Sequence, residues 1–199
     1  MARPKGKREN ILASATDVFS NKGFHMTNIM DIADHAGIGK GTVYEYFDSK
    51  SDLFIEVLKF NTERFLERIK SSIDAVDGFL PKLNTFIETH RVIVGENFQV
   101  TGLFISNPSA MKNVAENGQE VMRILCEGRD QSALIVHSIL ELGVSEQVIK
   151  ATHLELISDL FLEMLHKCNL RVYFKSLSQE QAQLEQQQLI DFLLNGIGA

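Results

Sequence analysis

The 199-residue chain is long enough to form a substantial core, and its 44% hydrophobic and 23% charged residues exclude an intrinsically disordered protein. No apolar run approaches the roughly 20 residues that cross a bilayer, and an amphipathic stretch, not a signal-peptide core, follows the basic N-terminus. We therefore expect a cytoplasmic protein with no membrane partner. The net charge of −6 is uneven: residues 1–50 hold seven Lys and Arg against six Asp and Glu, and residues 51–199 hold thirteen against twenty. The N-terminal part can still bind phosphates, because charges more than about 8 Å apart are screened at physiological salt.

Hydrophobic residues recur at helical spacing throughout the first 60 residues. The predicted helices span residues 5–22, 28–35, 40–47 and a long stretch that begins at a capping box over 49–52. Gly23 is expected to end the first helix, Thr27 to cap the second, and Gly37 to follow it in the left-handed conformation. The first three helices are therefore separated by short turns.

The same spacing continues to the C-terminus, and no alternating pattern bounded by hairpin turns predicts a strand. The later helices are predicted over residues 81–95, in short pieces over 98–111, and over 112–142, 145–173 and 178–194. Ser145 is expected to cap one long helix, and Ser178 with Gln181 has the spacing of a capping box for the last. We predict an all-α fold of about nine helices, with a three-helix domain over residues 1–50 and a larger helical domain over 51–199.

Residues 27–47 place two short helices around a glycine-containing turn, which is the pattern of a helix-turn-helix. The residues that could hold the two helices together are Ile32, Ala33, Ile38, Val43 and Phe47. The residues left to face outward are Lys40, Gly41, Thr42, Tyr44 and Tyr46. Because an α-helix fits the major groove of DNA, the second helix is the candidate recognition helix.

The outward-facing residues have the chemistry that DNA binding requires. Lys40 and, beyond the helix, Lys50 can neutralise phosphates, and the two tyrosine hydroxyls can donate to phosphate oxygens. Thr42 can reach a base edge or a thymine methyl group, and Thr27 opens a helix whose free N–H groups favour a phosphate. The alternative is that the tyrosines only pack. The glycines at 37, 39 and 41 match neither a dinucleotide fingerprint nor a phosphate loop.

This segment resembles the tetracycline-repressor (TetR) family over about residues 8–55. The matching residues are Lys22-Gly23-Phe24, Thr27, Ile32-Ala33, Ala36-Gly37-Ile38, Lys40 to Phe47 and Lys50 to Leu53. The resemblance implies a homodimeric transcription regulator, most often a repressor, that binds double-stranded operator DNA. It implies phosphate contacts by Thr27, Tyr44, Tyr46 and Lys50, and it places Lys40, Gly41 and Thr42 at the base edges. Gly39 is a departure, because many relatives have Ser or Thr there, so one side-chain cap is missing.

The resemblance also implies that the last two long helices form the dimer interface, as a four-helix bundle with their twofold mates. Broad apolar faces on both helices fit this role, and the candidate interface residues are Leu160, Met164, Leu189, Phe192 and Leu193. The alternative is that these faces belong to the internal core of one chain, and a wide apolar face can serve both purposes.

The middle of the chain is rich in phenylalanine, and in the TetR family this part encloses an effector pocket. We predict a small hydrophobic effector for the domain over residues 51–199. The candidate effector-binding residues are Phe65, Phe86, His90, Phe104 and Phe161. For each of them, an ordinary place in the core is the alternative.

Metal binding and catalysis have little support in the sequence. Glu163 and His166 have the spacing seen in helical di-metal sites, but such sites need a second copy of this motif, and the sequence has none. No residues suggest a nucleophile with its base and orienting group. We expect no metal, no cofactor and no enzymatic activity. The alternatives are a helix-turn-helix regulator without a small effector, or a helical enzyme or carrier with a vestigial helix-turn-helix.

Overall fold

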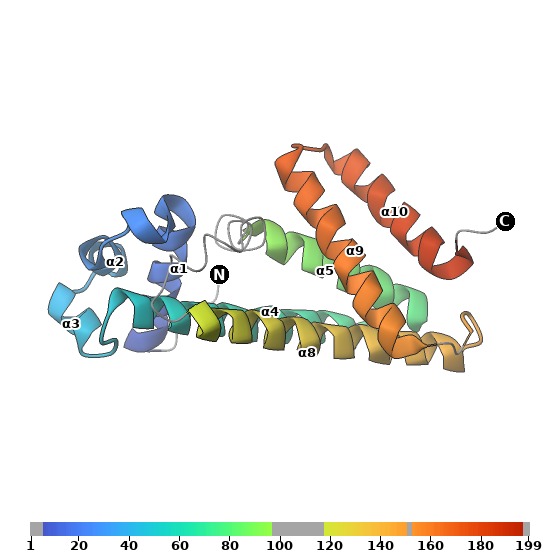
Figure 1. Ribbon diagram of the computed structural model, residues 1–199, viewed down its shortest axis with the longest axis horizontal. Helices are drawn as coiled ribbons and strands as arrows, with labels where there is room; N and C mark the ends of the chain where they lie inside the picture. The colour runs from blue at the N-terminus through green and yellow to red at the C-terminus, as the bar shows by residue number, and fades with distance from the viewer. Residues whose placement is uncertain (1–5, 97–117, 151–152, 197–199) are drawn as a thin grey trace. The chain divides into compact units, whose positions relative to one another are not determined.

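The computed structural model describes residues 6–96, 118–150 and 153–196, and within these ranges every regular element is a helix (Figure 1). The helices are α1 (Lys7–Met26), α2 (Ile29–Ala36), α3 (Lys40–Tyr44), α4 (Lys50–Asp74), α5 (Phe79–Glu96), α8 (Gly118–Ser145), α9 (Leu154–Phe174) and α10 (Gln179–Asn195). The predicted all-α fold is confirmed. The short helical pieces predicted over 98–111 lie outside the described residues. None of the described helices is long and apolar enough to span a membrane.

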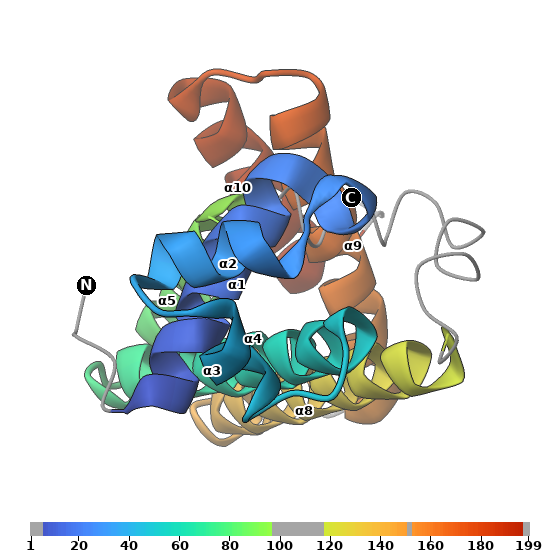
Figure 2. The same cartoon turned by 90° about the vertical axis from the view of Figure 1, so that its left-hand side faces the viewer.

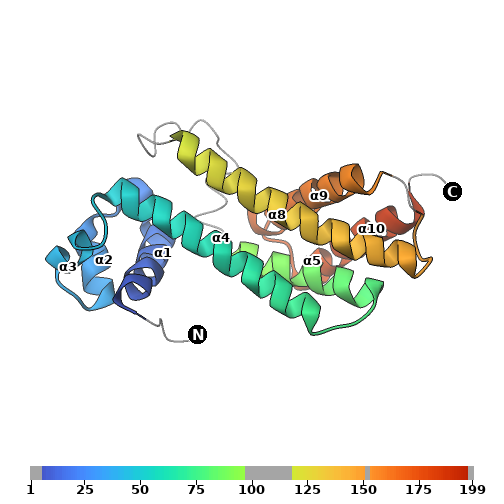
Figure 3. The same ribbon diagram turned by 90° about the horizontal axis from the view of Figure 1, so that it is seen from below.

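The described residues form two compact units. Unit 1 holds those up to Arg64 together with 118–127, and unit 2 holds 65–96 and those from Gly128 onward. The long helices α4 and α8, visible in Figure 3, each contribute one end to unit 1 and the other to unit 2. Unit 1 extends beyond residue 50, where we predict the functional boundary, because the first turns of α4 pack with α1, α2 and α3.

The core of unit 1 takes one apolar face from each of its helices. Its buried side chains include Ile11, Leu12, Ala15, Val18 and Phe19 of α1, Ile29, Ile32 and Ala33 of α2, Val43 of α3, and Leu53, Phe54 and Val57 of α4. The rings of Phe19 and Phe54 meet edge to face, with centroids 5.2 Å apart. Val121 and Ile124 of α8 are buried in the same cluster. Each buried Val, Leu, Ile or Phe side chain contributes about 1.5–3 kcal/mol, so packing is what holds these short helices in place.

The core of unit 2 is built in the same way from α5, α9, α10 and the unit 2 ends of α4 and α8. Its buried members include Ile69, Phe79, Leu83, Phe86, Val136, Ile139, Phe161, Leu165, Leu189 and Ile190. A Cβ atom placed on Gly143 would lie 2.8 Å from the ring of Phe79, so the absence of a side chain at Gly143 permits this close packing. The residue that follows α8 caps the N-terminus of α5, because the backbone N–H of Phe79 donates to the carboxylate of Glu146 (3.1 and 3.2 Å).

One long helix begins later than the sequence indicates. We predict α9 from Ser145, but it begins at Leu154. Ser145 instead lies in the last turn of α8, where its hydroxyl donates to the carbonyl of Leu142 (2.8 Å). The reason is that α8 continues past Gly143, which is packed against Phe79 and does not end the helix.

Candidate nucleic-acid interface

The helix-turn-helix consists of α2 and α3 joined by a turn at Gly37 (Figure 2). Gly37 has φ 69° and ψ 33°, the left-handed conformation predicted for it, and its N–H donates to the carbonyl oxygens of Ala33 and Asp34. The N–H of Ile38 also bonds to Ala33 (3.0 Å). This hydrogen-bonded turn directs the chain from α2 into α3.

The N-terminus of α2 is capped by Asn28, so the predicted cap at Thr27 is wrong. Asn28 and Asp31 form a reciprocal capping box, with distances of 2.9 and 3.0 Å. The backbone N–H of Asn28 is the largest cause that lowers the pKa of Asp31, and the ammonium of Lys22 at 2.9 Å adds to it. The hydroxyl of Thr27 cannot reach this position, because it donates to the carbonyl of Gly23 (2.7 Å).

The recognition helix α3 is short, and it is held by two buried apolar residues, Val43 on its inner face and Phe47 in the turn that follows it. Its N-cap is Gly39, which provides no side-chain hydrogen bond, as the sequence indicates. Regular α-helix ends at Tyr44, three residues earlier than predicted, and hydrogen bonds from Tyr46 and Phe47 to the carbonyl of Val43 continue the turn. The helix therefore depends on packing more than on its own caps.

The outer face of α3 is open to solvent. Lys40 and Gly41 are exposed, Thr42 is half-buried, and Tyr44 and Tyr46 are 46% and 42% exposed. The ammonium of Lys40 lies 5.7 Å from the centre of the Tyr44 ring, close enough for a cation–π interaction. A Cβ atom on Gly41 would meet nothing within 4 Å. The structure thus places five of the seven predicted DNA-contact residues together on this face.

The remaining two, Thr27 and Lys50, have partners inside the protein. Thr27 is buried. The ammonium of Lys50 donates to the carbonyl oxygens of Phe24 (3.0 Å) and Thr27 (2.8 Å), and it lies 4.5 Å from the centre of the Phe24 ring. Lys50 therefore ties the first turn of α4 to the last turn of α1 and to the loop that leads from α1 into α2. This leaves one of its three N–H donors for another acceptor.

Arg8 is a residue that sequence reasoning did not single out within the basic N-terminus. Its guanidinium lies 5.5 Å from the centre of the Phe47 ring and pairs with the carboxylate of Glu56. It therefore connects the first turn of α1 to the end of the recognition-helix segment and to α4. No sequence pattern could have found it, because Glu56 lies 48 positions away.

In unit 2, three of the predicted effector-binding residues come together around a polar pair. The buried ring of His90 is edge-on to Phe65 (5.4 Å between centroids) and tilted against Phe86 (5.9 Å). Burial is the largest cause that lowers the pKa of His90, to about 3, and nearby His166 adds to it. The ring is therefore neutral at pH 7, and the buried amide of Asn169 donates to its Nδ1 (2.8 Å). Sequence reasoning missed Asn169.

The other two candidates are not part of this group. Phe161 is fully buried in the core of unit 2, and Phe104 lies outside the described residues. No group of three or more His, Cys, Asp or Glu side chains in the described part of the chain could hold a metal ion. Glu163 instead pairs with Arg129 at 3.5 Å.

The predicted interface residues divide between the surface and the core of unit 2. Leu160 of α9 and Phe192 of α10 are 53% and 37% exposed, whereas Met164 and Leu193 are half-buried and Leu189 is buried. Leu156, Leu184 and Phe174 are further large apolar side chains that α9 and α10 expose. These two helices pack against each other (Figure 1), and the apolar side chains named above remain exposed among the described residues.

Residues 11–57 match the family model described as bacterial regulatory proteins, tetR family. The chain is 31% identical over 90 residues to the fatty acid metabolism regulator protein of Bacillus subtilis (strain 168), which covers 45% of this chain and 46% of that protein. It is 31% identical over 100 residues to the HTH-type transcriptional repressor KstR2 of Mycolicibacterium smegmatis, and this match covers 50% of this chain and 49% of the repressor. The chain thus spans about half the length of the curated relatives it matches.

The fold is similar over nearly the whole chain to a solved structure, that of the transcriptional regulator FadR from Bacillus subtilis in complex with stearoyl-CoA. The TM-score is 0.71, the match covers 95% of this chain and 98% of that chain, and the sequence identity is 21%. At this identity, the likeness shows a common fold.

Proposed function

We propose that this chain, whose residues 11–57 match the model of the tetR family of bacterial regulatory proteins, regulates transcription by binding a palindromic operator DNA as a homodimer. The observation that carries the proposal is the outer face of α3 and of the turn that follows it, where Lys40, Tyr44 and Tyr46 are exposed and Thr42 is half-buried. The inner face of the same helix is buried at Val43. A helix presented in this way fits the major groove.

Each residue of this face has a role that its chemistry suits. Lys40, Gly41 and Thr42 reach base edges at the N-terminal end of α3, where Gly41 lets the backbone approach closely. Tyr44 and Tyr46 donate to phosphates. Lys50 and Thr27 hold the loop that leads into α2, and the remaining N–H of Lys50 can point to a phosphate.

A second copy of the chain is the partner that doubles the small surface with which α3 contacts DNA. DNA readers of this type bind two half-sites about one helical turn apart. The exposed apolar side chains of α9 and α10, Leu160 and Phe192 among them, are the surface that the two copies bury. Leu189 and Leu193 support this surface from within each chain.

A small hydrophobic effector releases the operator in this proposal, so that the protein acts as a repressor. The support is the apolar surrounding of the His90–Asn169 pair in unit 2, since specificity in apolar binding sites comes from a few buried polar groups. A structural relative was solved with stearoyl-CoA. Stearoyl-CoA and free stearate are therefore the first compounds to add to a preformed complex of protein and DNA.

A gel-shift assay with the DNA that flanks the chain's own gene tests the proposal. We expect a retarded band at moderate salt, from a duplex that contains a palindrome, and a complex with two chains or a multiple of two. Failure to bind any palindromic site there would instead favour a helical enzyme or carrier with a vestigial helix-turn-helix. Binding that no small hydrophobic compound changes would favour a regulator without an effector.

A further inference from the structure

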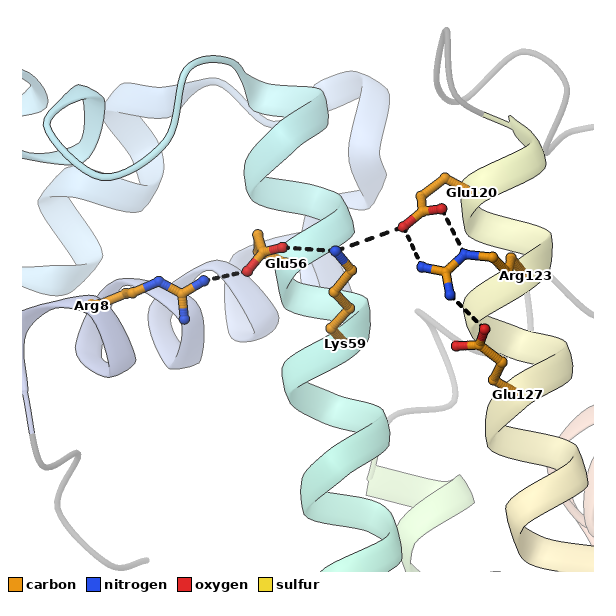
Figure 4. Close-up of polar contacts among 6 residues, drawn as sticks. All are labelled: Arg8, Glu56, Lys59, Glu120, Arg123 and Glu127. Carbon is orange, nitrogen blue, oxygen red and sulfur yellow. Dashed lines mark hydrogen bonds and ion pairs between the residues drawn. The ribbon is translucent and has the colours of Figure 1, made fainter.

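A continuous ladder of ion pairs crosses unit 1 from α1 through α4 to α8 (Figure 4). Arg8 of α1 pairs with Glu56 of α4, and the other carboxylate oxygen of Glu56 accepts from Lys59 at 3.0 Å. Lys59 also faces Glu120 of α8 at 3.7 Å. Two nitrogens of Arg123 donate to Glu120 at 2.7 and 2.8 Å, and a third donates to Glu127.

The pKa shifts at the centre of the ladder favour the charged forms of Glu56, Lys59 and Glu120. Partial burial would raise the pKa of Glu56, but Lys59 and Arg8 outweigh it and hold that pKa below its usual value. The hydrogen bond from Arg123 is the main cause that lowers the pKa of Glu120. The hydrogen bond to Glu56 raises the pKa of Lys59. Neither carboxylate therefore loses its charge under physiological conditions.

The two ends of the ladder touch the parts of unit 1 that matter most for DNA binding. At one end, Arg8 lies over the ring of Phe47, the buried residue that ends the recognition-helix segment. At the other end, α8 places Val121 and Ile124 in the same hydrophobic cluster as Phe47. The first turns of α8 are thus both packed and ion-paired within the DNA-binding unit.

Both helices of the central pair leave this unit. α4 continues past Arg64, and α8 continues past Glu127, into unit 2. Lys59 is the residue that joins them, because it pairs with one carboxylate on its own helix and with one on α8. If α8 shifts along or around α4, the distance between Lys59 and Glu120 changes before any other ion pair of the ladder is disturbed.

We propose that Lys59 and Glu120 are positioning residues for DNA binding, which fasten the first turns of α8 to α4 and thereby hold Arg8, Glu56 and the recognition helix in one arrangement. The inference rests on the proposed function and adds a means of control to it, because any event that moves α8 also changes the position of the recognition helix α3. Single part-exposed ion pairs contribute little to stability, but a network that spans three helices orders all of them together. A ligand that favours one arrangement of α8 would then shift operator affinity.

The experiment compares three variants of the full-length chain: Lys59→Met, Glu120→Gln and the two combined. Methionine keeps the apolar stem of Lys59, so packing is preserved. Operator affinity is measured by fluorescence anisotropy on a duplex that the unaltered chain selects from random sequences. We expect each single variant to bind about two- to five-fold more weakly, and the double variant no more weakly than the weaker single one, as for residues that act through one contact. Lys59→Arg should restore binding.

Glu96→Gln is the matched control. Glu96 pairs with Arg68 between α5 and α4, so this variant also removes one part-exposed carboxylate between two helices, but in unit 2. We expect its operator affinity to equal that of the unaltered chain. A purely stabilising ladder would lower the unfolding temperature of the unit 1 variants without changing their operator affinity while they are folded, and that result would overturn the proposal.

Amide hydrogen exchange over residues 118–127 provides a test that needs no DNA. Faster exchange in Lys59→Met and Glu120→Gln, and not in Glu96→Gln, supports the fastening of α8; unchanged exchange refutes it. Should the unaltered chain select no duplex at all, the proposed function fails, and with it the role of the ladder in DNA binding. The exchange result then decides separately whether the ladder holds α8.

Discussion

The ammonium of Lys50 is the contact whose removal has the most direct consequence for the DNA-binding unit. In Lys50→Met, the carbonyl oxygens of Phe24 and Thr27 each lose a charge-assisted, part-buried hydrogen bond, and the Phe24 ring loses its cation. Such hydrogen bonds contribute about 1.5–3 kcal/mol each when both partners are shielded. Because Lys50 is only half-buried and water can replace part of this bonding, we expect a total loss of about 2 kcal/mol. For a chain of this length, that loss lowers the unfolding temperature by roughly 4–8 °C.

Urea unfolding measures this loss, and tyrosine fluorescence is a suitable probe of unit 1. The chain has no Trp, and two of its three tyrosines, Tyr44 and Tyr46, lie at the recognition helix. Lys40→Met is the matched control, since Lys40 is exposed and lies near the Tyr44 ring at a cation–π distance of 5.7 Å. The stability of this variant should stay within about 0.5 kcal/mol of that of the unaltered chain. Equal stability of the two variants would refute the role assigned to Lys50. The salt dependence of DNA binding tests the phosphate contacts separately, because each lost contact lowers the slope by about 1.

Three further predictions concern single side chains. Thr42→Ala should change the preferred base at one position of a selected duplex and leave the preferences at the other positions unchanged. A uniform loss of affinity across sequences would mean that Thr42 contacts the DNA backbone and not a base. Gly143→Ala should destabilise the chain by about 1–2 kcal/mol, because the added methyl meets the Phe79 ring, whereas Gly41→Ala, with open space around it, should not lower thermal stability. Burial lowers the pKa of His90 to about 3, so the neutral ring must be protonated in acid. The free energy of unfolding should therefore fall by up to about 1.4 kcal/mol per pH unit as pH falls from about 6.5 toward 3. His90→Gln should flatten this part of the urea-midpoint profile, and an unchanged profile would show that His90 is not buried neutral.

The helix-turn-helix could be recognised from sequence because its determinants are local. The left-handed turn needs a residue such as Gly37, and the apolar spacing of Ile32, Val43 and Phe47 fixes which faces turn inward. The exposure of Tyr44 and Tyr46 follows from the same spacing. Sequence rules for helix caps are less decisive where two adjacent residues could both cap the same helix. Thr27 and Asn28 are both good N-caps, and the bond from Thr27 to Gly23 decides in favour of Asn28.

Contacts between distant residues were beyond the reach of the sequence pattern. A lysine that follows a helix-turn-helix has the same chemistry for a phosphate as for a backbone carbonyl, and only the fold brings Lys50 to Phe24 and Thr27. Lys59 and Glu120 are likewise paired by packing alone. On α10, the spacing of the apolar residues does not reveal that Leu189 lies in the core of unit 2 while Phe192 stays at the surface.

The specificity ratio of the full-length chain for DNA tests the central claim most directly. Affinity is measured for a palindromic duplex selected by the chain and for a scrambled duplex of the same composition, at the same salt concentration. If α3 reads base edges from two copies of the chain, the palindrome binds at least about 1,000-fold more tightly. Equal affinity for the two duplexes would mean that the exposed face of α3 contacts only the phosphate backbone, and would contradict the account.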